Sequence, residues 1–153
     1  MRAAVVTRPG GPEVLQLQEI EEPKPGPDDL LVNVKATALN RADLMQRQGN
    51  YPTPGGTRSD VLGLEMAGIV ATMGERVVGF KPGDRVCALL NGAGYAERVA
   101  FPAAMAVPIP PNLDFVQAAA VPEVFITAYD ALFNCCELKM GEWALIHAVG
   151  SCV

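Results

Sequence analysis

The chain has 153 residues, of which half are apolar and 19% are charged, and its formal net charge is −5. These values suit one folded domain, or one domain with a piece of another, and argue against a disordered chain. The chain has no basic run, so nucleic acid is not an expected partner. No apolar stretch reaches the roughly 18 residues that a membrane-spanning helix needs.

Short strands and tight turns dominate the first two thirds of the chain. Thirteen prolines and fifteen glycines supply the turn residues. Apolar and polar residues alternate in several of the runs between them, which is typical of half-buried strands. Many short strands with frequent turns predict a closed or nearly closed β-barrel. The predicted strands cover residues 3–7, 15–18, 32–37, 66–72, 85–90 and 95–101.

One segment, residues 38–52, concentrates chemically active side chains between a strand and a Pro/Gly-rich loop. Residues 42–48 predict a short helix, and Gly49 is a natural stop after it. A helix that starts at the end of a strand presents its side chains at the edge of a sheet. The segment is therefore our first candidate for a functional site, although an ordinary loop and helix would have the same pattern.

Composition changes after residues 108–111. Two Ala-rich stretches with apolar residues at helical spacing predict helices over 113–120 and 123–136. Residues 143–149 form a continuous apolar run, which is typical of a buried parallel strand. We therefore expect a mainly β domain over residues 1–121 and the first helix and strand of an α/β domain over residues 122–153.

Several motifs stand in the same order and at the same spacing as in a known superfamily. They are Asn40-Arg41-Ala42-Asp43 with Gly49 and Tyr51, Gly63-Leu64-Glu65, and Ala118 to Glu123 with Thr127-Ala128. In these residues the chain resembles the medium-chain dehydrogenase/reductase superfamily, above all its zinc-free NADPH:quinone oxidoreductases, including the p53-inducible type. The resemblance implies a GroES-like, partly closed β-barrel as the catalytic domain, followed by a truncated Rossmann domain.

Members of that group continue for roughly another domain's length. We therefore expect this chain to be the first part of such an enzyme, without most of the NADPH site and without measurable reductase activity of its own. The group transfers hydride from NADPH to a quinone or a similar conjugated carbonyl. An enoyl reductase of the same superfamily and a non-enzymatic GroES-like binding or self-association module remain as alternatives, and a homo-oligomer is possible.

The same resemblance bears on metal binding. Zinc-dependent alcohol dehydrogenases of the superfamily place Cys where Asn40 stands and His where Leu64 stands. Leucine has no ligand atom, and an amide is a poor ligand for zinc. We therefore expect no catalytic zinc. The four cysteines form no C-x-x-C pair, which favours a reducing, cytoplasmic location over a disulfide framework.

Without a metal, hydrogen-bond donors must polarise the carbonyl that accepts hydride. Tyr51 is the candidate donor, although its ring could equally pack on the barrel. Asn40 is a candidate contact for substrate or cofactor, and its alternative role is to cap the helix that follows. By the resemblance, the Thr127 hydroxyl faces the nicotinamide, and its alternative is a bond to its own helical turn.

Four further groups of residues receive structural roles. Asp43 lies in the first turn of a helix, where a carboxylate is favoured, and could pair with Arg41 or Arg47. Glu65 has no metal to bind. His147 lies in the apolar run and is expected in the core. The cysteines are expected to be buried or partly buried.

Overall fold

A computed structural model of the chain describes residues 1–51 and 60–147, and within them the fold is mainly β, as expected. A two-stranded sheet pairs β1 with β2, and a five-stranded sheet has the order β6-β3-β4-β5-β7. All strand pairs are antiparallel. The strands are β1 (Arg2–Val6), β2 (Leu15–Glu19), β3 (Asp29–Thr37), β4 (Glu65–Met73), β5 (Arg85–Leu89), β6 (Arg98–Pro102) and β7 (Ala106–Pro108).

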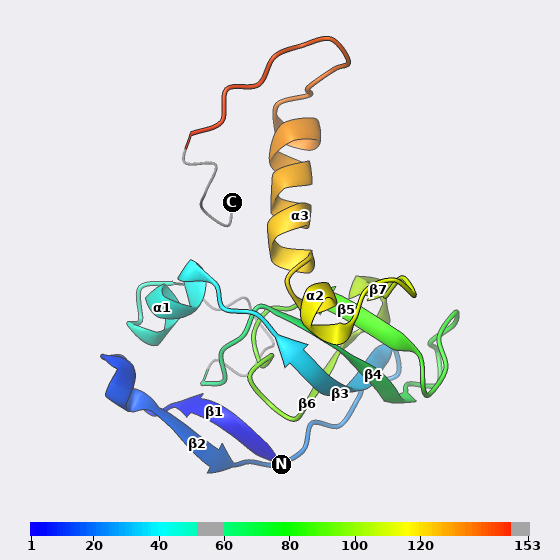
Figure 1. Ribbon diagram of the computed structural model, residues 1–153. Helices are drawn as coiled ribbons and strands as arrows, with labels where there is room; N and C mark the ends of the chain where they lie inside the picture. The colour runs from blue at the N-terminus through cyan, green and yellow to red at the C-terminus, as the bar shows by residue number, and fades with distance from the viewer. Residues whose placement is uncertain (52–59, 148–153) are drawn as a thin grey trace.

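The two sheets form no closed barrel within the described residues, which agrees with the partly closed barrel that the resemblance implies. Two isolated bridges, Ala3↔Ala96 and Val5↔Val61, connect β1 to the loops of the larger sheet. The short β1–β2 hairpin lies beside that sheet rather than within it (Figure 1). The result is a partly closed arrangement of two sheets.

The faces of β4 and β5 pack against different partners, because successive side chains in a strand point to opposite sides. Met66, Val70, Val86 and Ala88 belong to the main apolar core, which lies on one face of the larger sheet. On the opposite face, a smaller cluster joins the larger sheet to the short helix α2 (Phe115–Ala119). That cluster contains Ala67, Cys87, Ile109, Ala118 and Ala119. This second face is the one that carries the candidate site.

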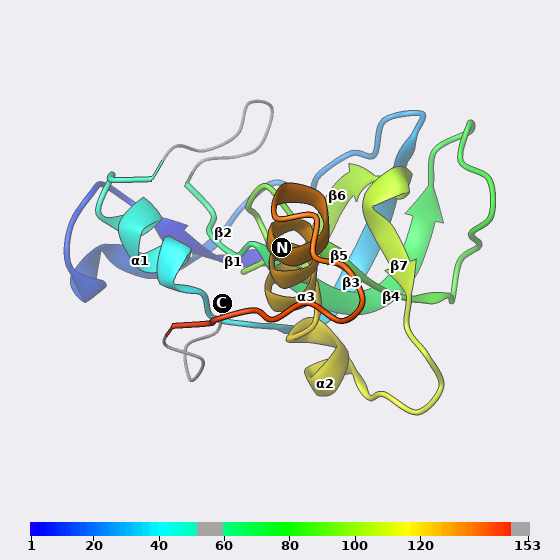
Figure 2. The same ribbon diagram turned by 90° about the horizontal axis from the view of Figure 1, so that it is seen from above.

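Two other helices frame that face. The helix α1 (Arg41–Arg47) follows β3 and ends before Gly49, whose φ of +79° allows the turn that stops the helix. The helix α3 (Pro122–Tyr129) continues as one turn of π-helix, η3 (Asp130–Cys135), so the helix predicted over 123–136 is confirmed. It rises away from the sheet in Figure 1 and is seen end-on in Figure 2. Two short 3-10 turns, η1 (Pro12–Val14) and η2 (Ala103–Met105), complete the elements.

The strand predicted over 143–149 is wrong for the described part of that run. Residues 142–146 have no regular structure, and Trp143 is 98% exposed. A parallel strand needs neighbouring strands to satisfy its backbone, and none of the described strands lies beside this run. His147 is exposed as well, so its expected place in a core is also wrong. Residues 148 and 149 lie outside the described part.

No helix among residues 1–51 and 60–147 combines the length and the apolar character that crossing a membrane requires.

Candidate functional site

The start of α1 is fixed by side chains from its own first turn. Asn40 is the N-cap and forms a capping box with Asp43, whose Oδ2 accepts the backbone N–H of Asn40 at 2.7 Å. Asn40 therefore caps α1, which is one of the two roles that the sequence predicted for it. It leaves the carboxamide nitrogen available for a second partner.

That partner is Glu65, the first residue of β4, which is 1% exposed. The Nδ2 atom of Asn40 donates to Glu65 Oε1 at 2.8 Å. The other oxygen, Oε2, accepts the backbone N–H of Glu123 in the first turn of α3 at 2.9 Å. One buried carboxylate thus connects the start of α1 to the start of α3.

Asp43 has an unexpected partner. Its Oδ2 accepts a hydrogen bond from the Tyr95 hydroxyl at 2.6 Å. Arg41 or Arg47 was expected to pair with it, but Arg47 Nε donates instead to the carbonyl of Gly10 at 3.2 Å. Asp43 is 4% exposed, and a long guanidinium side chain needs solvent space that this position lacks. Tyr95 is a residue that sequence reasoning did not select.

Gly63 allows Tyr95 to reach Asp43. Its φ is +103°, and a Cβ at this position would lie 2.7 Å from Tyr95 N and 2.7 Å from Tyr95 Cδ1. The backbone N–H of Tyr95 donates to the carbonyl of Leu62 at 2.9 Å, which holds the two segments together. The glycine of the Gly63-Leu64-Glu65 motif therefore positions a tyrosine, a role that its place in the sequence does not reveal.

Burial and neighbouring carboxylates shift several acidities at this site. Burial raises the pKa of the Tyr95 hydroxyl far above its ordinary value, and the hydrogen bond to Asp43 raises it further. Burial, followed by the charges of Glu65 and Asp43, also raises the pKa of Glu123. Burial raises the pKa of the Cys87 thiol, with a smaller contribution from Glu65. Each shift favours the neutral form of its group, so the site resists further negative charge.

Thr127 lines a hollow of about 560 Å³ beside α3. Leu89 of β5 also lines this hollow and lies directly opposite Glu65 in the β4–β5 pairing. Opposed residues in an antiparallel pair project to the same face, so Glu65 and the hollow lie on one side of the sheet. The remaining lining residues come from α3 and η3: Phe125, Ile126, Tyr129, Asp130 and Asn134.

The structure therefore brings two of the three predicted site residues to the base of α3. Asn40 reaches it through Glu65, and Thr127 lies one helical turn after Glu123. Tyr51 is not among the described residues that line this hollow. It is 37% exposed and immediately precedes residues outside the described part. Its predicted donor role stays a prediction.

The two positions that hold zinc ligands in the zinc-dependent alcohol dehydrogenases are Leu64 and Asn40 in this chain. Leu64 is buried and aliphatic, and the Asn40 amide binds Glu65. Among the described residues, no group of three or more His, Cys, Asp or Glu side chains is arranged to hold a metal ion. Cys87 is buried, as expected, whereas Cys135 and Cys136 are exposed, which corrects the prediction for those two thiols.

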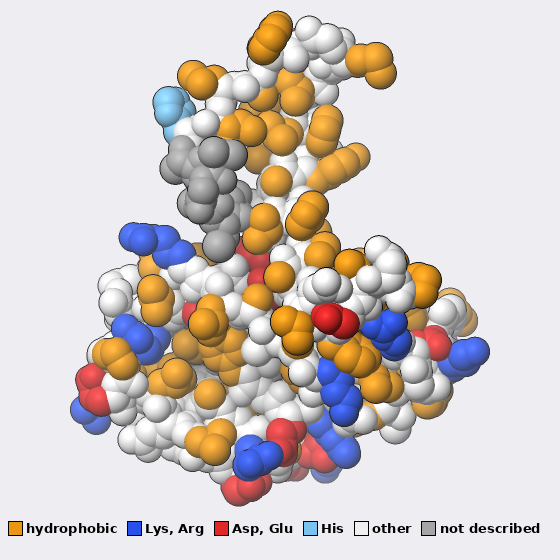
Figure 3. Space-filling model, viewed as in Figure 1, with side chains coloured by type: hydrophobic (Ala, Val, Ile, Leu, Met, Phe, Trp, Pro, Cys, Tyr) orange, Lys and Arg blue, Asp and Glu red, His pale blue; other side chains and the backbone are white. Residues whose placement is uncertain are grey.

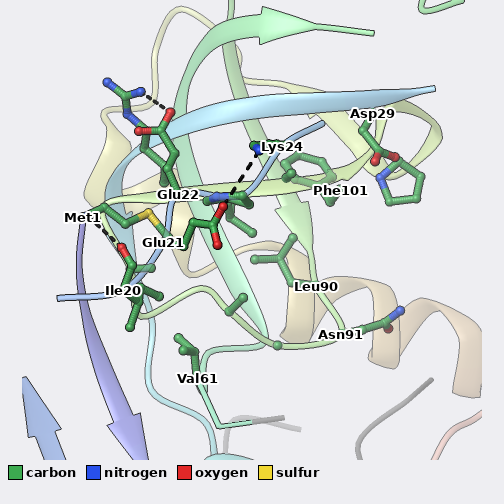
Figure 4. A pocket seen from close by; sticks show the side chains of 18 of the residues that line it. Met1, Ile20, Glu21, Glu22, Lys24, Asp29, Val61, Leu90, Asn91 and Phe101 are labelled. Carbon is green, nitrogen blue, oxygen red and sulfur yellow. Dashed lines mark hydrogen bonds and ion pairs between the residues drawn. The ribbon is translucent and has the colours of Figure 1, made fainter. Parts of the chain in front are cut away.

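A second cavity, of about 710 Å³, lies between the connection after β2 and the larger sheet. Figure 4 shows apolar side chains such as Leu90 and Phe101 inside it, with charged side chains such as Glu22 at its edge. None of Asn40, Tyr51 and Thr127 lines it. It is therefore separate from the candidate site.

Known proteins resemble this chain over most of its length. Residues 26–111 match the family described as the alcohol dehydrogenase GroES-like domain. The synaptic vesicle membrane protein VAT-1 homolog-like of Mus musculus is 41% identical over 150 residues, covering 98% of this chain and 36% of that protein. The quinone oxidoreductase of Lama guanicoe is 38% identical over 153 residues, covering 96% of this chain and 45% of that protein.

A solved structure agrees. The Escherichia coli quinone oxidoreductase complexed with NADPH matches with a TM-score of 0.78 and 34% identity, covering 86% of this chain and 40% of that one. This chain thus spans less than half the length of these three relatives. With its mainly β architecture and its matched residues, the chain belongs to the family of alcohol dehydrogenase GroES-like domains, within the medium-chain dehydrogenase/reductase superfamily.

Proposed function

We propose that this chain is the N-terminal part of an NADPH:quinone oxidoreductase and supplies the substrate-side wall of its hydride-transfer site. The observation that carries the proposal is the Glu65 carboxylate, which joins Asn40 to the base of α3 beside the hollow lined by Thr127. Relatives named quinone oxidoreductase, one of them solved with NADPH, support this choice of reaction.

Neutral hydrogen-bonding groups suit the nicotinamide end of such a cofactor. Asn40 keeps one amide N–H beyond the bond to Glu65, and Thr127 offers a hydroxyl. Both match a carboxamide or a carbonyl without adding charge to an already acidic site. When bound, the cofactor supplies hydride, and Tyr51 donates to the oxygen on which negative charge develops.

We assign no residue of this chain to the phosphates and the adenosine part of the cofactor. The phosphates of a dinucleotide bind at a glycine-rich turn and the next helix N-terminus of a Rossmann domain, and residues 122–153 would supply only the beginning of such a domain. We therefore assign residues 1–121 to the catalytic domain and expect the 153-residue chain to be inactive. A zinc-free, cytoplasmic enzyme is part of the same proposal.

The test compares this chain with a version extended by the Rossmann domain of the Escherichia coli quinone oxidoreductase. We expect the extended protein to oxidise NADPH with 1,4-naphthoquinone, and the 153-residue chain to show no activity above background. In the extended protein, Asn40→Ala and Thr127→Ala should each lower kcat/KM at least tenfold. Asn91→Ala is the matched control, because Asn91 is exposed and lines the other cavity. Equal activity of all variants contradicts the assignment of the site, and robust activity of the short chain contradicts its expected inactivity.

A second function, self-association, is favoured by one observation. Apolar side chains gather along α3 and the segment after it, where Figure 3 shows them on the part that projects from the domain. The large exposed apolar residues there are Phe125, Ile126, Tyr129, Phe133, Met140, Trp143, Leu145 and Ile146. A surface of this kind drives association in water.

Sedimentation at low micromolar concentration tests this second function. We expect the wild-type chain to associate and the double variant Phe125→Ser/Tyr129→Ser to sediment as a monomer. The control is Leu17→Ser/Val78→Ser, which removes two comparably exposed apolar side chains that belong neither to α3 nor to the segment after it. A wild-type chain that sediments as a clean monomer contradicts self-association.

A further inference from the structure

Glu65 uses both of its carboxylate oxygens, and it uses them on two different elements. Oε1 binds Asn40 at the start of α1, and Oε2 binds the Glu123 N–H at the start of α3. Its own backbone is fixed as well, since Thr37 Oγ1 donates to the Glu65 carbonyl at 2.6 Å. The residue is therefore a fixed acceptor between the first turns of two helices.

An acceptor of this kind determines which way the Asn40 carboxamide points. Glu65 Oε1 accepts and Asn40 Nδ2 donates, so the Asn40 nitrogen, and not its oxygen, faces Glu65. The flipped amide would place two acceptors against each other in a buried site. The second N–H of Asn40 then remains for a ligand and always points the same way.

The bond between Glu65 Oε2 and the Glu123 N–H fixes the first turn of α3. The first N–H groups of a helix have no partner within it, and Glu65 satisfies that of Glu123. Thr127 lies four residues later, which places it on the same face of the helix one turn further on. The place where α3 begins therefore decides where the Thr127 hydroxyl lies over the hollow.

We propose that Glu65 is a positioning residue that sets the orientation of the Asn40 amide and the placement of Thr127 together, so that the two walls of the site keep one geometry. The purpose of this role rests on the proposed function, but the link that Glu65 makes between Asn40 and α3 involves only residues of this chain. Glu65 touches neither substrate nor cofactor in this role.

Amide proton exchange and side-chain NMR signals of the 153-residue chain test the proposal without any ligand. In Glu65→Leu, we expect the Glu123 amide to exchange at least tenfold faster and the Asn40 side-chain NH₂ signal to lose its protected proton. Amides of β3 and β5 should stay within about twofold of wild type. Uniformly faster exchange across these strands would mean that Glu65 only supports the fold, and would overturn the proposal.

Glu65→Gln separates the two bonds. Glutamine can accept from Glu123 through Oε1 while its NH₂ group faces Asn40, which forces the Asn40 amide to flip. We expect the Glu123 amide to keep its protection within about threefold, while the protected Asn40 NH₂ proton disappears. If Glu65→Gln leaves the Asn40 signal unchanged, Glu65 does not set that amide and the proposal fails.

The double variant Asn40→Asp/Glu65→Gln reverses donor and acceptor. Asn40→Asp alone places two carboxylates together, and the amide that Glu65→Gln supplies restores a matched pair. We expect Asn40→Asp to speed Glu123 exchange at least tenfold and the double variant to recover most of that loss. No recovery contradicts the coupling.

Glu142→Leu is the matched control for these exchange measurements. The exposed Glu142 Oε2 accepts the Lys139 backbone N–H at 2.7 Å, so its loss should affect Lys139 and leave Glu123 unchanged. A failed reductase assay with intact coupling would refute the proposed function alone, and the reverse pattern would refute the coupling alone.

Discussion

The Asp43 carboxylate is buried and accepts two hydrogen bonds at one oxygen, from the Asn40 backbone and from the Tyr95 hydroxyl. Removing the hydroxyl leaves a buried charge with one donor fewer. We expect Tyr95→Phe to lower the free energy of unfolding by about 1–3 kcal/mol, which is the usual cost when a buried group bound to a charge loses its partner. Urea denaturation measures it.

Tyr129→Phe is the control for this substitution. Tyr129 is 60% exposed and contacts Phe133 through its ring, so loss of its hydroxyl should change stability by less than about 0.5 kcal/mol. If the two variants lose the same amount, the Tyr95–Asp43 hydrogen bond contributes nothing to folding.

Alkaline pH gives a second test of Tyr95. Its pKa is raised in the folded state above the ordinary value of 10.0, so the unfolded chain loses the tyrosine proton first as pH rises. The contribution of Tyr95 to stability is complete below about pH 10 and falls above it, by about 1.4 kcal/mol per pH unit, until the folded state also titrates. The stability difference between wild type and Tyr95→Phe should therefore shrink between pH 9 and pH 11. A constant difference over that range contradicts the raised pKa.

At the scale of elements, Gly68 sets how closely β3 and β4 approach. A Cβ at Gly68 would lie 2.3 Å from the carbonyl oxygen of Asn33, and the β3–β4 pairing shifts register between Val34 and Ala36 nearby. Backbone atoms cannot move aside as a flexible side chain does. We expect Gly68→Ala to lower the free energy of unfolding by about 3 kcal/mol, the upper end of the range for overpacking.

Gly79→Ala serves as the comparison for Gly68→Ala. Its φ is +85°, but an added Cβ would meet nothing within 4 Å. The cost there should be about 1 kcal/mol, from backbone strain alone. A smaller loss at Gly68 than at Gly79 would show that the two strands separate easily.

Sequence patterns that span only a few residues predicted several strands and the end of one helix correctly. Alternation of apolar and polar residues predicted β2 and β3, and Gly49 marked the end of α1. A glycine within a strand, such as Gly68, is also a general signal for a bulge or a close backbone approach. Such features depend on backbone sterics and periodicity, which any short window of sequence contains.

Contacts between distant segments were not predictable in the same way. Asp43 and Tyr95 are 52 residues apart, and nothing in either motif indicates the other. Asn40 was a candidate from its motif, but its bond to Glu65 and the link to Glu123 required the fold. The run after residue 142 shows the opposite error, because an apolar pattern indicates a strand only where neighbouring strands are available to pair with it.

At the scale of the whole molecule, α3 and the chain after it project from the domain with their apolar side chains uncovered (Figures 1 and 3). Trp143 lies in this projecting part and is the only tryptophan of the chain. Its fluorescence therefore reports on whatever covers that part, whether a second copy of the chain or an added domain.

We expect Trp143 in the dilute monomer to emit like N-acetyltryptophanamide in buffer and to be quenched by acrylamide as efficiently, because its side chain is 98% exposed. Raising the protein concentration into the range where the chain associates should shift the emission to shorter wavelength and weaken quenching, since association places the indole in an apolar contact. The Phe125→Ser/Tyr129→Ser variant should keep solvent-like emission at every concentration. A blue-shifted, protected tryptophan in the dilute monomer would contradict the exposed position, and would place residues 142–147 against the domain instead.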